Sequence, residues 1–124
     1  MADLDHLLGS YNVRDELDDI ASADPPAYLR RCFAEGISAP ELNRARVQQL
    51  AVCAMVHDSI VHDRDYESLE PELMSDWRAH FALACSRMRE LAAAALRRAR
   101  EALGSEDPDA VADLEDLEHR LGAA

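Results

Sequence analysis

The sequence has no lysine, few aromatic residues and no long hydrophobic run. All thirteen basic residues are arginines, which points to the base composition of the genome or to a salt-adapted host and to no particular chemistry. The longest apolar stretch, residues 50–56, is far shorter than the ~18–20 residues that span a bilayer. The first residues also lack the basic and apolar regions of a secretory signal. We therefore expect a cytoplasmic protein with no membrane partner.

Cysteine is also scarce. The three cysteines, Cys32, Cys53 and Cys85, form no Cys-x-x-Cys pair, and each lies in an apolar helical context. An odd number of thiols without paired spacing favours reduced, buried side chains that act as small hydrophobic groups. A disulfide or a reactive thiol is the alternative.

Positive charge is outnumbered by negative charge. Thirteen basic residues face 25 acidic ones, and the formal net charge is −12. Such a balance favours solubility and opposes binding to the phosphate backbone of nucleic acids. We therefore expect no nucleic-acid partner.

What the sequence does contain is helical periodicity. A chain of 124 residues with 48% hydrophobic residues is long enough for one core, so we expect a single domain over residues 1–124. No segment alternates apolar and polar residues as a half-buried strand would. Glycine and proline fall between the periodic segments. The sequence predicts an all-α bundle of four to six helices.

The predicted bundle is organised around a central helix over residues 39–61. Ser38 and Glu41 match a capping box, and Pro40 is tolerated in a first turn. The apolar run 50–56 leaves no polar face for two helical turns, so this helix is expected to be buried on all sides.

Amphipathic segments on both sides of this helix are predicted to cover it. Before it we expect a helix that starts at Asp24 and stops at Gly36, and either one kinked helix or two within residues 3–23. After it we expect one long helix over residues 71–103 and a last helix that starts at Asp107. The apolar residues of the long helix recur at alternating steps of three and four: Met74, Trp77, Phe81, Ala84, Met88, Leu91 and Ala95.

The length of the helix over residues 71–103 predicts a homodimer. At ~1.5 Å per residue it would measure roughly 50 Å, whereas a domain of this size has a radius of gyration of about 14 Å. Part of its apolar stripe would then be buried against a second copy, most simply with two-fold symmetry.

Opposite charges mark the last two predicted helices. Six arginines and two glutamates lie in residues 77–103, whereas seven acidic residues and one arginine lie in residues 104–124. The last helix is therefore expected to fold back on the long one, oriented by charge and held by leucines. The same complementarity could instead join two copies of the chain.

One group of residues has the composition of a metal site. His57, Asp58 and His62 follow the apolar run, and imidazole and carboxylate groups together form hydrolytic metal sites. His57 and His62 point about 140° from each other on a helix, so they cannot bind one metal ion while the helix continues. Asp58 and His62 can meet, but their spacing also stabilises a helix end unaided. His80, close to Asp76 in the sequence, would approach His57 if the long helix packs antiparallel to the central one.

An apolar helix that runs into His57-Asp58 resembles the local signature of the HD-domain phosphohydrolases. In that family a histidine from an earlier helix, the His-Asp pair and a later aspartate bind one or two metal ions. The resemblance covers about ten of the 124 residues and implies metal-ligand roles for His57 and Asp58. His6 is the only earlier histidine, and no later aspartate has a recognisable context, so the likeness is local and does not assign the family.

These patterns give three hypotheses about function. The first is a small helical module that acts by association with itself or with another protein, with no catalytic residues and no cofactor. The alternative is a metal-dependent, hydrolase-like protein in which His57, Asp58, His62 and His80 are the candidate ligands. The third is a regulator that binds a small molecule along the methionine and aromatic stripe around Trp77. Phosphate loops, nucleophile elbows and dinucleotide fingerprints are absent from the sequence.

Overall fold

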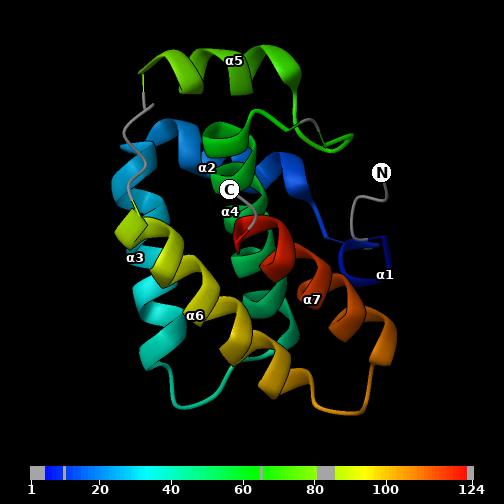
Figure 1. Cartoon of the computed structure of the whole chain (residues 1–124). Helices are drawn as coiled ribbons and strands as arrows, with labels where there is room; N and C mark the ends of the chain where they lie inside the picture. The colour runs from blue at the N-terminus through cyan, green and yellow to red at the C-terminus, as the bar shows by residue number, and fades with distance from the viewer. Residues whose placement is uncertain (1–4, 10, 65, 81–85, 123–124) are drawn as a thin grey trace.

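The computed structural model describes residues 5–9, 11–64, 66–80 and 86–122. These residues contain no strand and form seven α-helical segments, the first of which is a single turn. In chain order they are α1 (Asp5–Leu8), α2 (Val13–Ser22), α3 (Pro25–Ser38), α4 (Arg44–His62), α5 (Pro71–His80), α6 (Ser86–Leu103) and α7 (Pro108–Gly122). Within the described ranges no helix is long and apolar enough to cross a lipid bilayer. The predicted all-α fold is confirmed (Figure 1).

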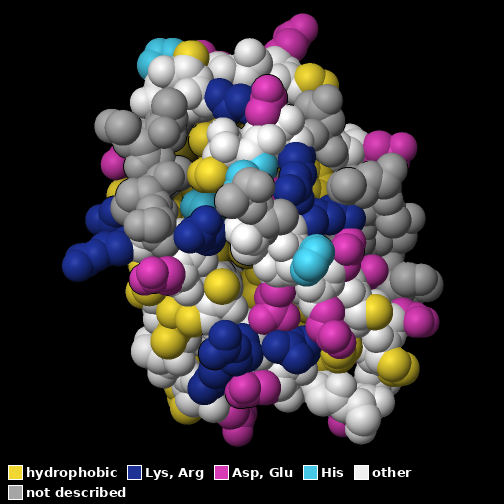
Figure 2. Space-filling model, in the orientation of Figure 1, with side chains coloured by type: hydrophobic (Ala, Val, Ile, Leu, Met, Phe, Trp, Pro, Cys, Tyr) yellow, Lys and Arg dark blue, Asp and Glu magenta, His cyan; other side chains and the backbone are white. Residues whose placement is uncertain are grey.

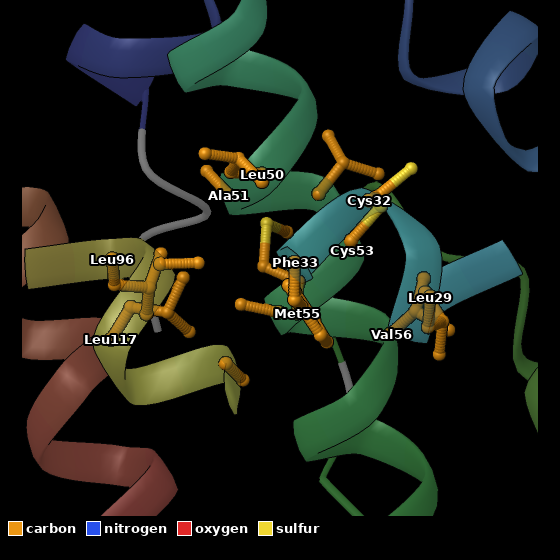
Figure 3. Packing of buried hydrophobic residues seen from close by; sticks show 14 of the residues in the cluster. Leu29, Cys32, Phe33, Leu50, Ala51, Cys53, Met55, Val56, Leu96 and Leu117 are labelled. Atoms are coloured by element: carbon orange, nitrogen blue, oxygen red, sulfur yellow. The ribbon is translucent and has the colours of Figure 1, made fainter. Parts of the chain in front are cut away.

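Helix α4 is the buried centre of this arrangement. Every residue from 50 to 60 is buried, and residues 50–56 are fully shielded from solvent. α4 packs against α2, α3, α5, α6 and α7. Leu29 of α3, Leu96 of α6 and Leu117 of α7 belong to the core around it (Figure 3). The predicted burial of this helix is confirmed.

The start of α4 differs from the prediction, which placed the helix over residues 39–61 with Ser38 as its cap. Asn43 caps it instead, since its side chain accepts a hydrogen bond from the Arg46 N–H at 2.8 Å. Ser38 is the last residue of α3, where its hydroxyl donates to the Ala34 carbonyl at 3.0 Å. A hydroxyl engaged in this way does not cap a following helix, and the residues between α3 and α4 form a loop.

Gly36 does not end α3, although the sequence predicted a stop there. It lies inside the helix and is buried. A Cβ atom at this position would lie 2.8 Å from Leu50 Cδ1. The absence of a side chain at Gly36 lets Leu50 of α4 pack directly against the backbone of α3, and the helix continues past it.

The predicted single helix over residues 71–103 is two helices, α5 and α6, in the part of the chain that the structure describes. α5 lies across the end of α4, whereas α6 runs along the bundle in a different direction (Figure 1). Met74 and Trp77 of α5 are buried, as is Met88 of α6. Both helices pack against α4, and α6 packs against α3 and α7 as well. Apolar residues recur with the same spacing whether one helix or two consecutive helices carry them. The sequence pattern therefore does not show where the chain changes direction. Phe81 and Ala84 of the predicted stripe, and Cys85, lie outside the described residues.

The last helix folds back on α6, as predicted. α7 begins after Asp107, whose carboxylate accepts a hydrogen bond from the Ala110 N–H at 3.1 Å. α6 and α7 lie side by side in Figure 1 and pack against each other. Arg100 and Glu118 form an ion pair between them at 2.8 Å. The opposite charges of α6 and α7 therefore pair within one chain.

Residues before α3 form two separate helices, which settles the alternative that the sequence left open. α1 ends at Leu8 and α2 begins at Val13. Asn12 caps α2, because its side chain accepts a hydrogen bond from the Asp15 N–H at 3.1 Å. α2 packs against α3 and α4, and α1 packs against α7.

Candidate functional site

The last two turns of α4 bring polar residues into the interior of the fold. His57, Asp58 and Ser59 follow the apolar run and are 1%, 0% and 0% exposed. They stay enclosed because α3, α5 and α7 pack against α4. Buried polar groups are stable only where other groups satisfy them, so the partners of these residues define what this region can do.

Asp58 is held by hydrogen bonds to both of its carboxylate oxygens. Oδ1 lies 2.7 Å from His62 Nδ1, and Oδ2 accepts a hydrogen bond from the Tyr66 hydroxyl at 2.6 Å. The Arg64 guanidinium lies 3.7 Å from Oδ2. Burial and the hydrogen bond to Asp58 raise the pKa of Tyr66, so its hydroxyl stays protonated and remains a donor. The buried carboxylate is thus compensated by groups of its own chain.

A residue from the last helix completes this group. Arg120 of α7 places its guanidinium 5.4 Å from the centre of the Tyr66 ring and pairs with Asp116 at 2.5 Å. Its Nη1 is buried and has no hydrogen-bond partner among the residues that the structure describes. We refer to the following residues as the Asp58 cluster: Asp58, His62, Arg64, Tyr66 and Arg120.

A further arginine closes the end of α4. Arg78 of α5 donates from Nε to the Ser59 carbonyl at 2.9 Å and pairs with Asp63 at 2.9 Å. The Ser59 hydroxyl donates to the Arg64 carbonyl at 2.7 Å. Cations are favoured at the C-terminal end of a helix, where the last carbonyls lack helical partners. These contacts support the interpretation of this region as a stabilised helix end.

His57 contrasts with its neighbour, because neither nitrogen of its buried ring has a hydrogen-bond partner among the described residues. The Phe33 ring lies edge-on to it, with the two ring centres 6.5 Å apart and an angle of 84° between the ring planes. Burial, opposed in part by the charge of Asp58, lowers the pKa of His57 to about 4. The imidazole is therefore neutral near pH 7, with one nitrogen able to donate and the other able to accept.

The structure brings together two of the four candidate ligands. Asp58 and His62 meet one turn apart, as their spacing predicted. His57 is adjacent in the chain, but no hydrogen bond joins its ring to either of them. His80 lies on α5 with its side chain 66% exposed, and its Nδ1 is 3.4 Å from Asp76 of the same helix. The predicted approach of His80 to His57 is not among the described contacts.

The described residues alone build no complete metal site. Within the ranges that the structure describes, no three His, Cys, Asp or Glu side chains are placed to hold a metal ion. His6, the earlier histidine of the HD-like pattern, lies in α1, which packs against α7. Structural and catalytic zinc sites use three or four protein ligands, so a metal role for His57, Asp58, His62 and His80 stays a prediction.

Sequence reasoning missed the partners that come from other parts of the chain. Arg120 lies between Leu117 and Leu121 on the buried face of α7. A charged residue on an apolar stripe signals a buried partner, and this signal could have been used. Tyr66 follows α4 in a loop and has no comparable local signal.

A second buried carboxylate was also missed. Glu16 of α2 accepts hydrogen bonds from the hydroxyls of Tyr11 and Tyr28, each at 2.5 Å. Burial, together with the hydrogen bond to Glu16, raises the pKa of both tyrosines. Glu16 lies in the first turn of α2 and also on its buried face, with Leu17 and Ile20. Its hydrogen bonds tie α2 to α3.

An open groove lies on the surface between the α3–α4 loop and α6. Its volume is about 450 Å³. The Arg98 guanidinium donates a hydrogen bond to the Ala39 carbonyl at its edge. The residues that line this groove, named here the 40–42 groove, are Pro40, Glu41, Leu42, Arg98, Glu101 and Ala102.

No protein-family model, no curated protein and no solved structure matches this chain. The likeness to the HD-domain phosphohydrolases rests on the residues around His57 and Asp58. Function is therefore inferred below from the contacts, burial and charge of the described residues.

Proposed function

We propose that this protein acts by association, with another protein or with a second copy of itself, and that it carries out no reaction. The observation that carries the proposal is the environment of Asp58. A carboxylate that binds a metal ion or acts as a general base needs a free oxygen and access to its substrate. Asp58 is fully buried, and its two oxygens are engaged by His62 and Tyr66. These partners make it a fixed part of the core.

The 40–42 groove is the proposed contact surface. Three of its six lining residues are apolar and two are acidic, while its arginine is engaged by the Ala39 carbonyl. An extended segment that carries apolar and basic side chains would complement this lining. The net charge of −12 would also speed the approach of a positively charged partner.

A homodimer is one form of this proposal. The length of a single helix over residues 71–103 no longer supports it, since α5 and α6 are shorter and bury apolar residues within the chain. Among the described residues Val61 is the one large hydrophobic residue that is exposed, at 39%. On the face seen in Figure 2, acidic and arginine side chains are interspersed. Two copies would therefore meet through a small and largely polar contact, most simply with two-fold symmetry.

Sedimentation velocity over a wide range of protein concentrations tests the homodimer. Leu42→Glu changes the groove, and Val61→Glu is the matched control outside it. We expect a concentration-dependent dimer in the wild type and in Val61→Glu, and a weaker dimer in Leu42→Glu. A monomer at every concentration in the wild type overturns the homodimer.

Cross-linking in the host cell, with the same two variants as baits, tests association with a different protein. A partner that is lost with Leu42→Glu and retained with Val61→Glu supports the proposed surface. A set of cross-linked proteins that Leu42→Glu leaves unchanged contradicts it.

A metal-dependent, hydrolase-like function is the second candidate, and His57 is the observation that favours it. Its ring nitrogens have no partner among the described residues, and Asp58 follows it directly. Elemental analysis of the purified wild type, His57→Ala and His80→Ala separates the two candidates. Stoichiometric metal in the wild type that is lost only in His57→Ala would replace association by the hydrolase-like function. Metal-free protein in all three preparations would remove the second candidate.

Two other hypotheses bear on this proposal. A cytoplasmic location is part of it, and the free thiols of Cys32 and Cys53 support that location. A small-molecule regulator that uses Met74 and Trp77 has less support, because both side chains are buried in the core.

A further inference from the structure

Helices α3 and α4 are antiparallel neighbours joined by a short loop, so the residues that face each other follow a regular register (Figure 1). Gly36 of α3 lies against Leu50 of α4. Cys32 is one turn before Gly36, and Cys53 is one turn after Leu50. Because the two helices run in opposite directions, this register places Cys32 opposite Cys53.

The two cysteines lie at the contact between α3 and α4. A Cβ atom on Gly36 would lie only 2.8 Å from Leu50 Cδ1, so the Leu50 side chain packs directly against the backbone of α3 at this level. Cys32 and Cys53 lie side by side between the two helices in Figure 3, and each thiol shifts the pKa of the other. A disulfide needs Cα atoms about 4.4–6.8 Å apart. Facing Cα atoms on helices whose axes are ~8–10 Å apart reach this range.

The two thiols differ in acidity. The neighbouring Cys32 thiol and complete burial both raise the pKa of Cys53. The neighbouring Cys53 thiol lowers the pKa of Cys32. Cys32 is therefore the thiol that loses its proton first, and Cys53 lies beside it as the second thiol.

We propose that Cys32 and Cys53 are an oxidisable pair that forms a disulfide between α3 and α4 when the protein meets hydrogen peroxide. The Cys32 thiolate attacks one peroxide oxygen, the O–O bond breaks, and the leaving hydroxide takes up a proton to form water. The Cys53 sulfur then attacks the sulfenic acid on Cys32, forms the S–S bond and releases the hydroxyl group as a second water. Two thiols and one peroxide thus give one disulfide and two water molecules.

Access to the pair requires motion. Cys32 is 3% and Cys53 is 0% exposed, so peroxide reaches them when α3 and α4 separate locally. Oxidation is therefore expected to be slow, and to be faster under conditions that loosen the fold. Once formed, the bond constrains the unfolded chain, and the oxidised protein should melt about 5–10 °C higher than the reduced protein.

Oxidation followed by peptide mapping tests this inference. Cleavage after arginine places Cys32, Cys53 and Cys85 in three different peptides, which span residues 32–44, 47–64 and 79–87. After prolonged exposure to excess hydrogen peroxide, the protein is alkylated under denaturing conditions and digested. We expect the first two peptides to be linked, with the mass of the pair reduced by two hydrogen atoms.

Two variants keep the test specific. Cys85→Ser is the matched control and should retain both the link and the rise in Tm. Cys32→Ser should lose both, and circular dichroism before oxidation checks that each variant is folded. Free thiols at both positions 32 and 53 after exposure would overturn the proposal. So would a link from either position to Cys85, or a sulfinic acid on Cys32 with Cys53 still free.

Discussion

Two consecutive residues of α4, His57 and Asp58, are equally buried, but the surrounding protein accommodates them in opposite ways. Asp58 has a hydrogen-bond partner at each oxygen, whereas His57 has none at either ring nitrogen among the described residues. A buried carboxylate with fixed donors is well tolerated, while an unpartnered buried polar group destabilises a fold by about 1–3 kcal/mol. The two residues of a His-Asp pair therefore need not share a task. Asp58 stabilises the C-terminal end of α4, whereas the packing of the fold does not explain why position 57 is a histidine.

Removing the Asp58 carboxylate should have the largest effect. In Asp58→Ala the Tyr66 hydroxyl, His62 and Arg64 lose their common acceptor inside the protein. We expect the free energy of unfolding, measured with urea, to fall by about 3–5 kcal/mol. Asp63→Asn removes an exposed charge at the same helix end, keeps a residue type suited to its positive φ of 53°, and should change it by less than about 1 kcal/mol. Equal effects of the two changes would contradict the special role of Asp58.

Lowering the pH should destabilise the protein through His57. Burial lowers the pKa of His57 in the folded protein to about 4, against 6.5 for an unperturbed histidine. As pH falls, the unfolded chain therefore takes up this proton before the folded protein does. The contribution of His57 to the free energy of unfolding is fully present above pH 6.5. It is lost as pH falls toward 4, which lowers this free energy by up to about 3 kcal/mol. His57→Leu should lack this loss in urea titrations between pH 7 and 4, so parallel pH profiles for the two proteins would show that the ring is solvated or partnered.

Tyr66→Phe should have a smaller effect than Asp58→Ala. It removes one donor from the carboxylate but leaves His62 and Arg64, and it keeps the ring beneath Arg120. We expect a loss of about 2 kcal/mol in the free energy of unfolding. Combined with Asp58→Ala it should add little, because both changes break the same hydrogen bond. Full additivity of the two changes in this double-mutant cycle would show that Tyr66 and Asp58 do not interact.

The smallest expected effect has the opposite sign. His57→Leu replaces a ring that has no hydrogen-bond partner among the described residues by an apolar side chain next to Phe33, and should stabilise the protein by about 1 kcal/mol at pH 7. His57→Gln keeps a polar group in the same place and should give no gain. A clear loss of stability in His57→Leu would mean that the ring holds a ligand or an ion, which would favour the hydrolase-like function.

Sequence patterns within one or two helical turns were sufficient to predict the features of the fold that depend on neighbouring residues. Residues 50–56 have no polar side, so their burial followed directly from the sequence. Asp107 caps the last helix, which was predicted to start there. Each of these features is decided within one or two helical turns.

Features decided by distant residues could not be read in this way. Gly36 looked like a helix stop, but it lies inside α3 with the Leu50 side chain of α4 packed against it. The stripe over residues 71–103 does not reveal that two helices carry it, or that α6 packs against α3 and α7 as well as α4. The same division holds in the candidate site. Asp58 and His62 meet through local spacing, whereas Tyr66 and Arg120 reach the cluster through tertiary packing.

One guanidinium links two helices that also pack against each other. Arg78 belongs to α5 but contacts the Ser59 carbonyl and Asp63, and the buried anchors of α5 are Met74 and Trp77. A fluctuation that detaches α5 therefore also releases the final turn of α4. In native-state hydrogen exchange, the amides of these two segments should share one opening free energy, well below that of the middle of α4.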